Sequence, residues 1–178
     1  MKRSLASLFL IFLTVTCYAQ GNQELIMKFQ PSFISHSVLT ISKTNKDAVI
    51  TLKIYDRKEE DSVLVEEERK LQRNELDSLL SFLSSYQFKI KGSIDTVGTS
   101  EITMDGKTVT VHHVSIGMDG VFVEGSYRDK YQVKDFAFWS PKGGSENHKL
   151  VMKVFDLMEA NLKKKAIQNY IVQLRGYF

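Results

Sequence analysis

Histidine is the side chain best suited to acid–base chemistry near neutral pH, and two of the four histidines in the chain, His112 and His113, are adjacent. They fall in a segment that reads as a β-strand, where neighbouring side chains point to opposite faces, so the pair cannot readily share one metal ion. His113 could still meet a carboxylate of an adjacent strand, such as that of Glu124, and act as a ligand or a general base. A hydrolase that uses His112 or His113 is therefore one hypothesis for the function.

Other catalytic signatures are missing from the sequence. It contains no Gly-x-Ser-x-Gly elbow, no Ser-x-x-Lys pair and no His-Glu-x-x-His motif. Gly106-Lys107-Thr108 has the ending of a phosphate-binding loop, but Glu101 occupies the position of the required first glycine, and the segment reads as a hairpin. The one cysteine is Cys17, so the rest of the chain has no thiol for a disulfide, a zinc site or a nucleophile. We therefore expect no catalytic residue, metal site or cofactor, and we favour a non-catalytic function over an enzyme.

Aromatic and cationic side chains are densest over 127–145. If this region is a strand, alternation places Trp139 on the face opposite Phe136 and Phe138, so that one set builds the core and the other lies on an open face. Exposed aromatic side chains beside cationic ones are typical of recognition surfaces, although burial of all these rings is the alternative. The predicted binding residues are Tyr127, Arg128, Phe138, Trp139, Lys142 and His113.

Hydrophobic periodicity predicts the strands that position these residues. Alternation is clearest over 48–55, where Ile50, Leu52 and Ile54 share one face. Asp105-Gly106 favours a tight hairpin turn, because both central residues of such a turn need positive φ. The other strands are predicted over 24–30, 33–42, 62–67, 101–104, 107–116, 121–128 and 131–139.

Two helical regions follow the strand runs. Leucines at helical spacing predict a helix that is capped by Asn74 and ends near Tyr86. Ser145 is the predicted cap of a second helical region with an apolar stripe over 150–174. The run 163–165 consists of three lysines and interrupts this stripe, so we expect either a kinked helix or two helices that meet there.

This order of strands, helix, strands and helix predicts an α+β fold. Close hairpins favour an antiparallel β-meander sheet, with four strands in the second half turning at 105–106 and 119–120, and with the helices packed on one face. We expect a single domain over 20–178, which could consist of two β-meander-plus-helix halves, 20–90 and 91–178.

Residues 1–19 have the features of a secretory signal peptide. The basic pair Lys2 and Arg3 precedes an apolar stretch, and the small residue Ala19 precedes the predicted cleavage site. Because the apolar stretch is too short to cross the hydrocarbon core of a bilayer comfortably, we expect cleavage before Gln20 and no transmembrane span afterwards.

Cys17 leaves a lipid anchor as the alternative to signal cleavage. A lipoprotein signal usually has leucine three residues before the lipidated cysteine, whereas Leu13 lies four residues before Cys17. This mismatch favours a periplasmic or secreted protein over a lipoprotein.

The charge balance excludes one class of partner. The formal net charge is +3, and two of the positive charges belong to the predicted signal peptide, so no strong field favours nucleic acid. We expect an exported protein that binds a protein, peptide or envelope component through an aromatic-bearing sheet face. A small-molecule or lipid binder with a cavity between the sheet and the C-terminal helix is the second hypothesis, and the hydrolase is the third.

Overall fold

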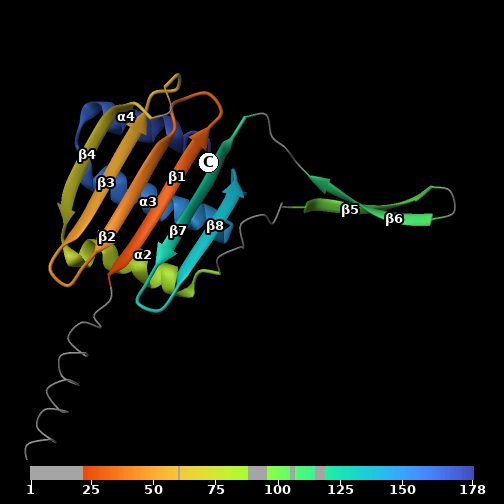
Figure 1. The fold of residues 1–178 in the computed structure, drawn as a ribbon, viewed down its shortest axis with the longest axis horizontal. Helices are drawn as coiled ribbons and strands as arrows, with labels where there is room; N and C mark the ends of the chain where they lie inside the picture. The colour runs from red at the N-terminus through yellow and green to blue at the C-terminus, as the bar shows by residue number, and fades with distance from the viewer. Residues whose placement is uncertain (1–21, 60, 88–95, 105–106, 115–118) are drawn as a thin grey trace, which may run out of the picture.

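A six-stranded antiparallel sheet forms one layer of the structure, and three helices cover one of its faces (Figure 1). The strand order is β4-β3-β2-β1-β7-β8. The elements of this body are β1 (Gln23–Pro31), β2 (Ser37–Lys43), β3 (Ala48–Tyr55), β4 (Val63–Leu71), α2 (Arg73–Ser85), β7 (Val121–Arg128), β8 (Val133–Trp139), α3 (Glu146–Asn161) and α4 (Lys165–Arg175). The arrangement confirms the predicted α+β fold with an antiparallel sheet and helices on one face.

This computed structural model describes 22–59, 61–87, 96–104, 107–114 and 119–178, with the backbone alone at 73, 96–99, 102, 104, 109 and 111–114. The predicted signal peptide, Cys17 within it, and the predicted turn at 105–106 lie outside the described residues. No described helix is both long and apolar enough to pass through a bilayer.

The second half of the chain does not form the predicted four-strand meander. Strands β5 (Thr96–Met104) and β6 (Lys107–Val114) form a separate two-stranded sheet, and Figure 1 shows this hairpin apart from the main sheet. β7 pairs instead with β1 on one side and with β8 on the other, so 119–120 is not a hairpin turn between β6 and β7. The Asp-Gly signal at 119–120 predicted pairing with the preceding strand, but β7 pairs with β1, which lies at the start of the described chain.

The core lies between the inner face of the sheet and the helices. Alternation along β3 buries Ala48, Ile50, Leu52 and Ile54, as the sequence predicted. The Phe29 and Phe155 rings stack across the two layers with centroids 5.8 Å apart. Burial of such large apolar side chains is the main stabilising contribution in a chain whose described part has no cysteine.

The caps of the first and second helical regions differ. The Oγ of Ser145 accepts a hydrogen bond from the backbone N–H of His148 at 3.2 Å, which confirms the predicted cap of α3. α2 begins one residue before Asn74, and its N-cap is Gln72. The reason is the carboxylate of Glu75, which accepts a hydrogen bond from the backbone N–H of Gln72 at 2.6 Å and so fixes the first turn.

A buried carboxylate joins the sheet to the corner between α3 and α4, where the sequence predicted an interruption. Glu67 lies on the inner face of β4 and is 3% exposed. It accepts hydrogen bonds from the backbone N–H groups of Lys163 at 3.0 Å and Lys164 at 2.8 Å, and from Nε of Arg69 at 2.9 Å. Lys164 is the N-cap of α4 and makes no side-chain cap of its own, so Glu67 supplies the missing acceptor.

Candidate functional site

A row of largely aromatic side chains crosses one end of the open face of the sheet, opposite the helices. The register pairs Trp139 of β8 with Phe122 of β7, and Phe122 with Gln30 of β1. His36 immediately precedes β2, and its backbone carbonyl accepts a hydrogen bond from the N–H of Tyr55 at 3.0 Å. We call Tyr55, His36, Gln30, Phe122 and Trp139 the aromatic row.

All five side chains of the aromatic row are partly exposed. The His36 imidazole and the Tyr55 phenol ring stack with centroids 4.7 Å apart and planes inclined by 7°. This stacking holds two rings in one orientation before any ligand arrives, which lowers the conformational entropy lost on binding.

Trp139 is held against the backbone at Gly120. A Cβ at Gly120 would lie 2.7 Å from Cε2 and Cζ2 of the Trp139 indole, and 2.5 Å from Oγ of Ser140. That hydroxyl oxygen in turn accepts a hydrogen bond from the N–H of Val121 at 2.8 Å. Only glycine leaves room for the indole at this position, so the orientation of Trp139 depends on the loop that precedes β7.

A hollow of about 480 Å³ adjoins the His36 and Tyr55 end of the aromatic row. Lys28 and Arg57 bring positive charge to this open-face hollow, and Asp61 brings one negative charge. The next row along the sheet carries cross-strand ion pairs, Lys28 with Glu124 at 3.8 Å and another between β3 and β4. This end of the open face therefore combines aromatic rings, a concave surface and neighbouring side chains of both charges.

The structure separates the predicted binding residues. Trp139 lies on the open face, a choice that alternation alone had left open, whereas Arg128 is exposed at the opposite end of β7 and Lys142 is exposed in the segment before α3. His113 pairs with Gly98 in the β5–β6 hairpin, and its side chain lies outside the described part of the structure, as does that of His112. Within the described residues, no three His, Cys, Asp or Glu side chains group as metal ligands would.

Tyr127 and Phe138 belong to the core and are not retained in the candidate site. Phe138 is 6% exposed and stacks with Phe136, because alternation turns it to the face opposite Trp139. Tyr127 is 2% exposed, and its hydroxyl accepts a hydrogen bond from Nε2 of Gln23 at 3.1 Å. Burial raises the pKa of this hydroxyl, so the phenol stays neutral and structural.

The sequence reasoning missed three members of the aromatic row: His36, Tyr55 and Phe122. Alternation did place Tyr55 on the face opposite the buried side chains of β3, which is one usable signal. Nothing local connected it to Trp139, because the two residues lie at opposite ends of the row and are linked only through His36 before β2, Gln30 of β1 and Phe122 of β7.

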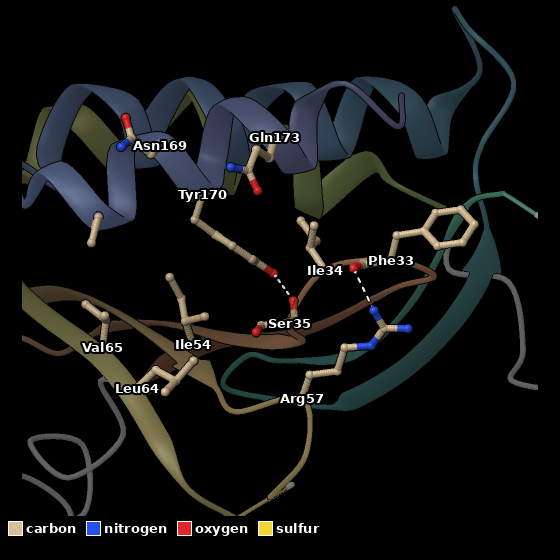
Figure 2. Close-up of a pocket in the computed structure, with 11 residues that line it drawn as sticks. Phe33, Ile34, Ser35, Ile54, Arg57, Leu64, Val65, Asn169, Tyr170 and Gln173 are labelled. Carbon is tan, nitrogen blue, oxygen red and sulfur yellow. Dashed lines mark hydrogen bonds between the residues drawn. The ribbon is translucent and has the colours of Figure 1, made fainter.

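A second hollow, which we call the α4 groove, lies between α4 and the same end of the sheet (Figure 2). Its volume is about 450 Å³. Tyr170 of α4 donates its O–H to the backbone carbonyl of Ser35 at 2.9 Å and so connects the helix with the loop that follows β1. Burial raises the pKa of Tyr170 far above its usual value, so this donor keeps its proton throughout the physiological range.

These features define an α+β protein with a helix-covered sheet and with two hollows at the same end of the strands. Comparison with protein-family models, curated proteins and solved structures gave no match to this chain. The residues of the two hollows are therefore the basis on which a function is proposed.

Proposed function

We propose that this protein is an exported, non-catalytic binding protein that recognises a protein or peptide of the cell envelope through the aromatic row. The observation that carries the proposal is the register, which gathers Trp139, Phe122, His36 and Tyr55 from separate strands into one line on the open face. Export rests on the signal-like features of 1–19.

The row has the composition expected of the centre of a protein interface. Tryptophan, tyrosine and phenylalanine are enriched where interfaces bury most free energy, because they remove a large apolar area from water at a small cost in rotamer entropy. The neighbouring ion pair between Lys28 and Glu124 supplies a polar border. The open-face hollow is large enough for one anchoring side chain of a partner.

The charged residues that line the open-face hollow indicate which kind of partner side chain could bind there. Lys28 and Arg57 outnumber Asp61 among the residues that line it. An aromatic or acidic side chain of the partner fits these surroundings better than a basic one, because it would stack on the rings or face the cations.

Truncation of the row is expected to weaken partner binding strongly. Trp139→Ala and Tyr55→Ala should each weaken the complex by about 30-fold or more, the usual effect of removing a ring at an interface centre. A partner captured from an envelope extract and then purified would be titrated against each variant by calorimetry. Trp139 is the only tryptophan, so its fluorescence reports directly on the proposed face in the wild-type protein.

Tyr131→Ala is the matched control, because Tyr131 is an aromatic residue that is 84% exposed in the turn at the other end of β7 and β8. It should bind the partner like the wild-type protein, and circular dichroism should be unchanged in all three variants. Wild-type affinity in both row variants, with no change in Trp139 emission on complex formation, would refute the proposed face.

A further inference from the structure

We propose that the α4 groove is a separate binding site for an amphipathic organic anion, a molecule with a hydrocarbon body that ends in a carboxylate. This inference goes beyond recognition of a partner on the open face, because it concerns a different class of ligand and a hollow between α4 and the sheet, which shares Arg57 and Ile34 with the open-face hollow.

The apolar part of the site is the floor of the groove. Ile54, Val65 and Leu64 lie below α4, with Phe33 at one end (Figure 2). Leu64 is 53% exposed and Phe33 is 58% exposed, which is a large apolar area to leave in water at a concave surface. A hydrocarbon chain in the groove would cover both side chains.

The charged part of the site is Arg57, at the same end of the groove as Phe33 (Figure 2). Its guanidinium donates to the backbone carbonyls of Phe33 at 2.9 Å and Ser32 at 3.3 Å. These bonds fix the position of the cation, and no carboxylate of the described residues forms an ion pair with it. A ligand carboxylate at this end could form that ion pair.

Gln173 adds a neutral polar group to the roof. It lies on the side of α4 that faces the groove, nearer to Arg57 than Asn169 does (Figure 2). Its exposed side-chain amide makes no hydrogen bond within the described part of the chain, so an N–H donor is free for a ligand oxygen. The apolar floor, the fixed cation and the free amide together match a molecule that is hydrophobic along its length and carries an acidic group at one end.

The volume is consistent with such a ligand. About 450 Å³ lies within the range of roughly 300–1,000 Å³ that small-molecule sites occupy. A ten-carbon fatty acid is a suitable probe, because it offers the hydrocarbon body and the carboxylate and nothing else.

The test compares three probes of the same length by calorimetry and by amide chemical-shift mapping on the full mature chain. Decanoate should bind about tenfold or more tightly than decanol, and decyltrimethylammonium should bind more weakly than either. Arg57→Gln should remove the preference for decanoate over decanol, whereas Arg57→Lys should retain most of it. Leu64→Asp should abolish decanoate binding, because it places a negative charge on an exposed position in the floor.

Val172→Asp is the matched control, since Val172 is an apolar residue of α4 that is 65% exposed and does not line the groove. It should bind decanoate like the wild-type protein. Equal affinities for decanoate and decanol, or decanoate binding that survives Leu64→Asp, would overturn the proposal. Tyr55→Ala should leave decanoate binding intact, so failure of this site and failure of the aromatic row can be told apart.

Discussion

Replacing Glu67 by alanine should lower the free energy of unfolding by about 3 kcal/mol. The substitution removes the acceptor for the backbone N–H groups of Lys163 and Lys164 and leaves these donors without their partner at the start of α4. It also deprives Arg69 of its carboxylate. The three effects occur together, because the one buried carboxylate accepts from both backbone N–H groups and from Arg69. Urea denaturation followed by circular dichroism would measure the change.

Glu68→Ala is the control for this experiment. Glu68 is the next residue on β4, but it is exposed on the opposite face, so its removal should change the free energy of unfolding by less than about 0.5 kcal/mol. An equal and small effect of both substitutions would show that Glu67 does not hold the corner between α3 and α4.

The contribution of the Glu67 hydrogen bonds to stability should also depend on pH. Burial opposes ionisation of Glu67, but hydrogen bonds from the backbone of Lys163 and Lys164 and from Arg69 outweigh burial and hold the pKa below its usual value of 4.5. Its contribution to stability is therefore fully present above about pH 4.5 and is lost as the pH falls through the lowered pKa. The difference in stability between the wild-type protein and Glu67→Gln should shrink below pH 4.5. A difference that stays constant to pH 2 would contradict this assignment.

Gly125→Ala should cost about 3 kcal/mol or prevent folding. Gly125 lies in β7 on the inner face, between Met27 of β1 and Phe136 of β8. A Cβ there would lie 2.1 Å from the backbone oxygen of Ile26 and 2.8 Å from Cζ of Phe136. The backbone oxygen cannot move without separating β1 from β7, so the two strands must part locally. Thermal unfolding of the variant would measure the loss.

Gly143→Ala provides the comparison, because a Cβ at Gly143 would meet nothing within 4 Å. It should leave the midpoint of thermal unfolding nearly unchanged. If both glycine variants were as stable as the wild-type protein, the close approach of β1 and β7 would be wrong.

Local pattern was enough to predict most elements and the fold class. The strand over 48–55 was predicted with the bounds that the structure has, because its alternation is strict and one face is buried completely. The burial of Glu67, in contrast, was not predicted from the local pattern. Glu67 sits in a run of three glutamates that gives no local sign of burial, yet strand alternation turns it alone of the three toward the helices.

The candidate site was harder to predict because it depends on which strands are neighbours. Alternation within its own segment separated Trp139 from Phe138, but it did not decide which of the two lies on the open face. His36 and Tyr55 join Trp139 only through pairings between distant parts of the chain. The α4 groove likewise needs a helix near the end of the chain to lie over the loop that follows β1.

The central position of β1 has a kinetic consequence. This strand is synthesised early, but one of its two neighbours is β7, which begins about 90 residues after the end of β1. Closing so long a loop costs entropy before any contact repays it, and folds rich in such contacts form slowly. The ribosome must therefore finish most of the polypeptide before β7 can pair with β1 and complete the sheet.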